Sequence, residues 1–198
     1  MALGQIALAW NGLHSQLALL FCSLMGGGYV NQFLGIWHAL KNDAAQRDIL
    51  EAAARGSRHN QEYGDEFGAK ILAEVQWIVG QARAVEDRRN DALHSPLWGE
   101  DGMRYRVLPV TGLGHRRAQK LADAAAVRGL LAEFRWCRDA ALILTEYARQ
   151  LDEAMTGRGP GSWPDRPSLP SRGQTKNAAT RRQSQKPKSR RRPQPSQE

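Results

Sequence analysis

Residues 127–151, VRGLLAEFRWCRDAALILTEYARQL, decide the fold class of this chain. Their apolar residues recur at alternating steps of three and four, which is the spacing along one face of an α-helix. The series comprises Val127, Leu130, Phe134, Cys137, Ala141, Leu144, Ala148 and Leu151. The stretch therefore predicts a long helix that buries one continuous apolar stripe.

A second stripe with the same period lies in residues 6–24 and comprises Ile6, Trp10, Leu13, Leu17, Leu20 and Leu24. It predicts a helix of about 20 residues that ends at Gly26–Gly28, because consecutive glycines are costly within a helix. The two stripes match in period and length. We therefore expect the two helices to pack along each other.

Two shorter helical patterns follow the first stripe. Apolar residues from Val30 to Leu40 again repeat with helical spacing. Asp43 and Gln46 then stand three residues apart, which is the spacing of a capping box at a helix N-terminus. We expect a second helix before Asn42 and a third, short helix that begins at this box.

A long central helix is predicted to start near Asp65 and to end close to Ser95, because the residue before a proline disfavours helical backbone. Beyond Pro96, Met103, Tyr105, Val107 and Pro109 alternate with Arg104, Arg106 and Leu108, after a turn signal at residues 99–102. That alternation is typical of a small β-hairpin. The fold class predicted for residues 1–156 is therefore mainly α, a bundle of about five helices with a small hairpin.

Residues 157–198 differ sharply in composition from the rest of the chain. They hold seven of the nine prolines, and Trp163 and Leu169 are their only large apolar side chains. Such a segment buries too little apolar surface to offset the entropy of ordering it. We therefore predict a disordered C-terminal tail, whose deletion leaves thermal stability nearly unchanged.

The net charge of +8 belongs to this tail. Residues 157–198 carry a net charge of +9, whereas residues 1–156 carry −1, so the charge does not identify the helical domain as a nucleic-acid binder. The basic side chains of the tail predict a sequence-independent, salt-sensitive attraction to RNA phosphates, with a merely solvating extension as the alternative. The clusters contain Arg181, Arg182, Lys186, Lys188, Arg190, Arg191 and Arg192.

Several classes of protein are disfavoured by the composition. Cys22 and Cys137 both lie in apolar helical patterns, which is typical of buried thiols and favours a reducing, cytoplasmic location. The histidines have no partners at metal-ligand spacing, so neither a metal nor another cofactor is expected. Residues 2–25 lack charge, but polar residues at their centre argue against a membrane span, and no basic region precedes them as in a signal peptide.

The end of the central helix carries the motif Arg89-Asn90-x-x-x-His94. Here the chain resembles the HEPN superfamily, all-helical domains whose ribonuclease members carry an arginine, a polar residue directly after it, and a histidine a few residues on. The resemblance implies catalytic roles for Arg89, Asn90 and His94. It also implies a homodimer that cleaves RNA in a toxin–antitoxin or defence setting, with a cognate antitoxin or other protein as partner.

Cleavage of RNA without a metal requires a base, an acid and a cation near phosphorus. On a regular helix, side chains five residues apart diverge by about 140°. Arg89 and His94 therefore meet on one phosphate only if the last turn opens or a second protomer contributes. By resemblance, His94 of each protomer shares proton transfer, Arg89 stabilises the charged phosphorus, and Asn90 orients His94 or the phosphate.

Plainer interpretations of the same residues stay open. Arg88, Arg89 and His94 are also the cations that a helix C-terminus favours. Arg116 and Arg117 follow a glycine-containing loop, which is either an anion site that helps to bind RNA or an ordinary loop. If these plainer interpretations hold, the chain is a catalytically inactive helical interaction module with a basic tail. A further alternative is a subunit whose first and last helices pair with another chain.

Overall fold

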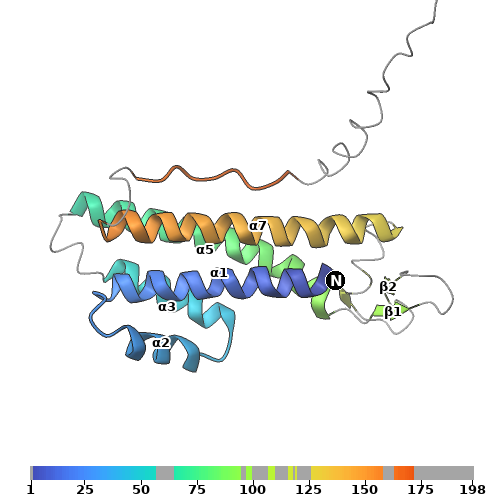
Figure 1. Cartoon of the computed structure of the whole chain (residues 1–198), viewed down its shortest axis with the longest axis horizontal. Coiled ribbons are helices and arrows are strands. Elements are labelled where there is room, and N and C mark those ends of the chain that lie inside the picture. Colours follow the sequence, from blue (N-terminus) through green and yellow to red (C-terminus); the bar gives the residue numbers. More distant parts are fainter. Residues whose placement is uncertain are drawn as a thin grey trace, which may run out of the picture.

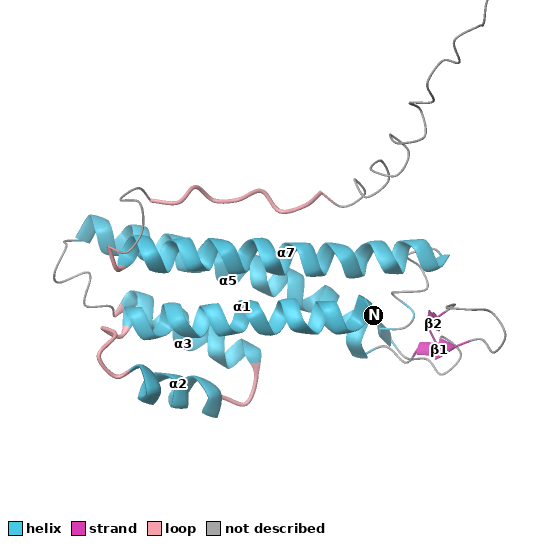
Figure 2. Ribbon diagram, in the orientation of Figure 1, coloured by secondary structure: helices cyan, strands magenta, loops and turns pink. Residues whose placement is uncertain are grey.

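A computed structural model describes residues 2–56, 65–94, 97–99, 107–109, 116–117, 119, 126–157 and 163–171. Five helices make up most of this part of the chain (Figures 1 and 2). They are α1 (Ala2–Leu24), α2 (Val30–Ala39), α3 (Asp43–Arg55), α5 (Asp65–His94) and α7 (Ala126–Met155). The predicted fold class, a mainly α bundle of about five helices, is confirmed.

The most extensive packing joins α1 to α7, as their matching stripes predict. The two helices run side by side in the same direction (Figure 1), and Arg138 of α7 reaches Gln5 of α1. Their facing side chains are almost fully buried, and Leu13, Leu17 and Leu144 have no accessible surface. Burying side chains of this size stabilises the fold by roughly 1.5 to 3 kcal/mol each.

Helix α5 runs in the opposite direction to α1 and α7 and crosses behind them (Figure 1). Its inward residues Ile71, Val75, Ile78, Ala82 and Val85 are fully buried and complete the core. Helix α3 packs against both α5 and α1, whereas α2 packs against α1. The last turns of α5 consequently lie beside the first half of α1 and the start of α3.

The N-terminus of α3 is capped differently from the expected capping box. The cap is Asn42, whose side-chain oxygen accepts a hydrogen bond of 2.8 Å from the backbone of Ala45. Asp43 is the first helical residue, and its carboxylate binds Trp10 of α1 instead. The Gln46 side chain contacts His14 and the backbone of Trp37. The prediction of a capping box was wrong because long-range partners occupy both side chains.

Two short strands lie in the segment for which a hairpin was expected. β1 (Leu97–Gly99) pairs antiparallel with β2 (Val107–Pro109), and Trp98 is opposite Leu108. Gly99, expected in the turn, is part of β1 and opposite Val107. Residues 100–106, which include most of the expected turn and Met103 and Tyr105, lie outside the described residues.

Residues 163–171, which we call the strap, lie within the segment predicted to be a disordered tail. They run in an extended conformation along the bundle (Figure 2), and Trp163 and Leu169 pack against the core. The Trp163 ring meets Phe67 edge-on at 5.4 Å. The strap therefore extends the folded unit beyond the expected boundary at residue 156. Residues 172–198 are outside the described part of the chain.

Other expectations concern the chemistry of the core. Both cysteine thiols are buried, and burial raises the pKa of Cys22. Trp10 and Trp37 are core residues, as their helical positions predict. Within the described residues, no three metal-ligating side chains gather at one place. No described helix combines the length and apolar character that crossing a membrane requires.

Candidate functional site

Arg89 lies near the end of α5 and points toward α1 and α3. Its guanidinium stacks over the Trp10 ring, 5.3 Å from the ring centroid, and donates a 2.9 Å hydrogen bond to the side-chain oxygen of Asn90. Asp43 lies 3.8 Å away, and 19% of the Arg89 side chain remains exposed. These contacts hold the cation in one orientation without sealing it from solvent.

Asp43 is the point at which three helices meet. Its Oδ2 accepts a 2.8 Å hydrogen bond from the indole nitrogen of Trp10 and lies near Nη1 of Arg89. The same oxygen is 3.9 Å from Nε2 of His14. One carboxylate thus joins α1, α3 and α5 around the candidate arginine.

A buried ion pair lies next to this group. Arg47 of α3 is 1% exposed and donates a short hydrogen bond to Glu86 of α5, three residues before Arg89. Burial of an arginine is costly unless an anion compensates its charge. Together with Arg89 and Asp43, the pair makes a polar cluster of two cations and two anions.

His14 completes the polar cluster from α1. Its Nδ1 is 2.8 Å from the Gln46 side-chain oxygen, so the ring is bonded at the edge of the core. Burial lowers the pKa of His14, although the carboxylate of Asp43 acts in the opposite direction. The imidazole is therefore neutral at pH 7, and the cluster carries no net charge.

His94 is the last residue of α5 and is exposed. The helix continues without interruption from Arg89 to His94, so the last turn does not open. At 100° per residue, the two side chains leave the helix about 140° apart. Within one chain, the structure therefore does not bring Arg89 and His94 together on one phosphate.

The remaining basic residues expected to bind RNA have different surroundings. Arg88 forms a 3.1 Å ion pair with Glu133 of α7, and Arg117 forms one of 3.1 Å with Asp91. Arg116 is exposed. The tail residues Arg181, Arg182, Lys186, Lys188, Arg190, Arg191 and Arg192 lie outside the described residues.

Three members of the polar cluster were not singled out from the sequence as site residues: Asp43, Arg47 and Glu86. Their contacts join residues 29 to 46 positions apart, for which helical spacing carries no signal. An arginine within an otherwise apolar helical face does, however, indicate a buried polar contact in the sequence. Arg47 lies three residues before the buried Leu50, and it is seven before the buried Ala54.

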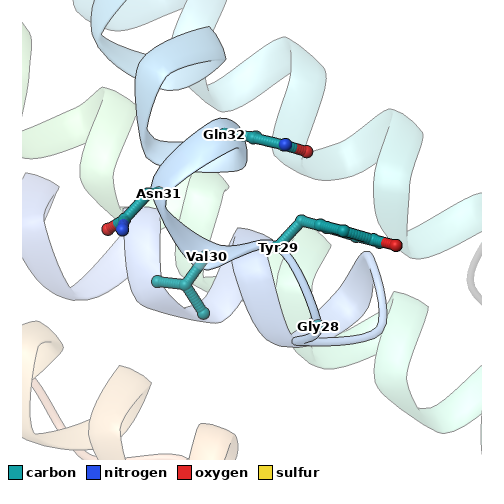
Figure 3. Close-up of a pocket in the computed structure, with 5 residues that line it drawn as sticks. All are labelled: Gly28, Tyr29, Val30, Asn31 and Gln32. Atoms are coloured by element: carbon teal, nitrogen blue, oxygen red, sulfur yellow. The ribbon is translucent and has the colours of Figure 1, made fainter.

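A surface hollow of about 380 Å³ lies away from the polar cluster, at the start of α2 (Figure 3). It is lined by five consecutive residues, Gly28–Gln32. The side chains of Asn31 and Tyr29 point to opposite sides of the chain rather than converging. Among the described residues that line it, none is a candidate site residue and no polar side chains converge.

Comparison of the chain with family models, curated proteins and solved structures found no match.

Proposed function

We propose that the protein is a metal-independent endoribonuclease of the HEPN type that acts as a homodimer. The observation that carries the proposal is the preorganised state of Arg89. Trp10, Asp43 and Asn90 fix its guanidinium, while part of the side chain stays accessible and the exposed His94 follows at the end of the same helix. A fixed cation and an exposed histidine are the kinds of group that catalysis at a phosphodiester uses.

The continuous helix favours a site shared by two protomers. Since Arg89 and His94 diverge within one chain, a second copy is needed to supply the acid or the base at the same phosphate. In the proposed reaction, the 2′-hydroxyl oxygen attacks phosphorus and gives its proton to one His94. The bond from phosphorus to the 5′-oxygen breaks, and His94 of the other protomer protonates that oxygen. The products are a 2′,3′-cyclic phosphate and a 5′-hydroxyl.

A second candidate function rests on the ion pairs. Asp43, Glu133 and Asp91 already pair with Arg89, Arg88 and Arg117 within the chain. In a helical interaction module these arginines stabilise helix contacts, and only the basic tail attracts nucleic acid. This alternative requires neither a dimer nor an accessible His94.

RNA cleavage in EDTA, with analysis of the end groups, distinguishes the two functions. We expect cleavage by the wild type, and a loss of at least 100-fold in His94→Ala, because general acid–base catalysis contributes about 10² to 10⁴ in rate. Exposed His38 on α2 provides the matched control, so His38→Ala should cleave normally. Cleavage by His94→Ala at the wild-type rate would refute the nuclease.

The oligomeric state gives an independent test. Sedimentation equilibrium should detect a dimer at the concentrations at which RNA is cleaved. A strictly monomeric protein that cleaves RNA would refute the shared site, and a monomer without cleavage would favour the interaction module.

A further inference from the structure

Prolines recur at every third residue of the strap: Pro164, Pro167 and Pro170. A polyproline II helix has three residues per turn, so this spacing places the prolines along one edge of an extended segment. All three are partly buried, whereas Asp165 and Ser168 between them are exposed. The strap therefore lies against the bundle on its proline edge.

The surface beneath the strap is rich in aromatic rings from two helices. Phe67 and Trp77 belong to α5, and Trp136 and Tyr147 belong to α7. The rings of Trp77 and Tyr147 meet edge-on at 5.1 Å and so join the helices. We call these four residues, with Lys70 and Glu74, the strap surface. Surfaces lined by aromatic rings are the usual receptors of proline-rich segments.

The strap surface contacts both ends of the strap. At the start, the Trp163 ring packs against Phe67, and the Lys70 ammonium lies 4.8 Å from the same ring. At the end, the backbone oxygen of Pro170 accepts a 2.7 Å hydrogen bond from the indole nitrogen of Trp136. Contacts to a single ring and a single carbonyl require of the ligand only an extended backbone.

The centre of the strap surface is a partly buried carboxylate. Nε of Arg166 is 2.7 Å from Oε2 of Glu74, and the guanidinium lies over the ring of Trp77. Tyr147 donates a 2.6 Å hydrogen bond to the same carboxylate oxygen, and Glu74 is 9% exposed. Burial of a carboxylate is costly unless a cation compensates its charge. Charge complementarity therefore requires a basic side chain at this point of any ligand.

The strap fits this site incompletely. A second hollow, of about 310 Å³, lies beside Pro167 and is lined also by Leu142, Ile143, Glu146, Tyr147 and Gln150 of α7. The indole nitrogen of Trp163 is buried and has no hydrogen-bond partner among the described residues. A buried donor without an acceptor costs about 1 to 3 kcal/mol. A segment with the same anchors that fills the hollow or supplies the acceptor would bind more tightly than the strap.

We propose that the strap surface is a receptor site for a proline-rich segment of a partner protein, and that the strap occupies this site as an intramolecular competitor. The segment carries an aromatic residue, an arginine three positions later and prolines at every third position, as Trp163, Arg166 and the strap prolines do. The partner binds by displacing the strap. The strap surface shares no residue with the polar cluster, so this binding requires neither RNA nor the proposed nuclease.

Displacement of the strap in the full wild-type chain tests the proposal. The probe is an unlabelled peptide of residues 163–171, added to ¹⁵N-labelled protein. The readout is the indole N–H resonance of the chain's own Trp163, which Trp163→Phe identifies. Displacement moves this resonance to its position in the free peptide. Because a tethered segment competes at an effective concentration on the order of 1 mM, half-displacement should occur near that peptide concentration. A peptide of the same composition in scrambled order should leave the resonance unchanged.

A strap-release variant, Trp163→Ala/Arg166→Ala, measures the affinity without the competitor. A fluorescent form of the peptide should bind this variant at least tenfold more tightly than it binds the wild type. Adding Glu74→Gln to the variant should weaken binding at least tenfold, because the arginine of the peptide loses its anion. Adding Glu153→Gln, on α7 outside the strap surface, should change binding less than twofold.

Circular dichroism establishes that the helices persist in each variant. If the strap-release variant is unfolded, Trp163→Ala/Leu169→Ala takes its place, because it keeps the cation beside Glu74. A Trp163 resonance that does not move at about 10 mM peptide would show that the strap is a permanent part of the fold, and would overturn the proposal. Equal affinities of the wild type and the strap-release variant, or binding that Glu74→Gln leaves unchanged, would overturn it as well.

The competing occupant of the strap surface is the strap of a second copy. Sedimentation equilibrium distinguishes it from a partner protein. We expect the wild type and the strap-release variant to have the same oligomeric state. A wild-type dimer that becomes a monomer on strap release would assign the strap surface to a second copy, and would overturn the assignment to a partner protein.

Discussion

Arg89 lies over the ring of Trp10, with its guanidinium carbon 5.3 Å from the ring centroid. This contact joins α5 to α1 and orients the cation toward Asp43. A planar guanidinium has a flat face that can stack on an aromatic ring while its N–H groups point to polar neighbours, whereas an ammonium has no such face. The shape of Arg89, and not only its charge, therefore fits its position.

Arg89→Lys tests this relationship. We expect a loss of about 1 kcal/mol in the free energy of unfolding, because the stacking and the bond to Asn90 are weakened. RNA cleavage should fall at least tenfold, since the remaining charge is no longer fixed. Urea titration and cleavage rates measure the two effects. Arg55→Lys, at an exposed position, should change neither.

The buried pair between Arg47 and Glu86 predicts a larger effect. Glu86→Gln should lower the free energy of unfolding by roughly 3 to 5 kcal/mol, because a buried arginine is left without its anion. Glu146→Gln, on the exposed surface of α7, should cost about 0 to 1 kcal/mol. If Arg47→Met/Glu86→Leu proves as unstable as Glu86→Gln, uncompensated charge is not the cause.

His14 predicts a pH dependence of stability with a definite sign. Burial lowers its pKa in the folded chain below the ordinary value of 6.5. As the pH falls below 6.5, the unfolded chain takes up a proton that the folded chain does not. The contribution of His14 to stability is therefore complete above this value and is lost as the pH falls toward the lowered pKa.

Urea titrations between pH 8 and pH 5 measure this contribution. The variant His14→Gln should lose less stability over the interval than the wild type, because it has no imidazole to protonate. His38→Gln, at an exposed position, should follow the wild-type curve. If the free energy of unfolding of His14→Gln falls with pH as steeply as that of the wild type, other groups cause the pH dependence.

The N-terminal cap of α3 is Asn42 rather than a capping box. Asn42→Ala should lower the free energy of unfolding by about 1 kcal/mol, because the amide of Ala45 loses its acceptor. Asn42→Ser should be close to neutral, since serine supplies another side-chain oxygen. Thermal unfolding monitored by circular dichroism compares the two variants. Equal losses would show that the cap bond is unimportant.

Two truncations distinguish the contribution of the strap from that of residues 172–198. Removal of residues 172–198 should leave the melting temperature within about 1 °C. Removal of residues 157–198 should lower it by several degrees, because each kcal/mol lost corresponds to roughly 2 to 4 °C in a domain of this size. This differs from the sequence-based prediction, since Trp163 and Arg166 contribute packing and an ion pair. Identical melting curves would show that the strap adds no stability.

The sequence predicts contacts that depend on periodic burial and misses those that depend on a single distant partner. The stripes of α1 and α7 repeat many times, so each position supports the others. Asn42 and Asp43, by contrast, are both good capping residues. Only the position of Trp10 decides which of them caps α3 and which binds across helices.

The strap was also missed from the sequence because its contacts depend on a few single residues. Its average composition indicates disorder, but Trp163 alone supplies a large apolar surface, and it lies three residues before an arginine. A prediction from average composition does not detect single anchoring residues of this kind. In the candidate site, Arg89 and His94 were visible as a motif, whereas the order imposed by Trp10 and Asp43 requires three helices to assemble.

The pairing of α1 with α7 also has a consequence for synthesis of the chain. The ribosome adds 101 residues between Leu24 and Ala126, which takes roughly 5 to 20 s. During that interval the apolar stripe of α1 has emerged, while the helix that covers most of it does not yet exist. We therefore expect the nascent chain, which has no charged side chain before Lys41, to leave this apolar surface uncovered until α7 has been synthesised.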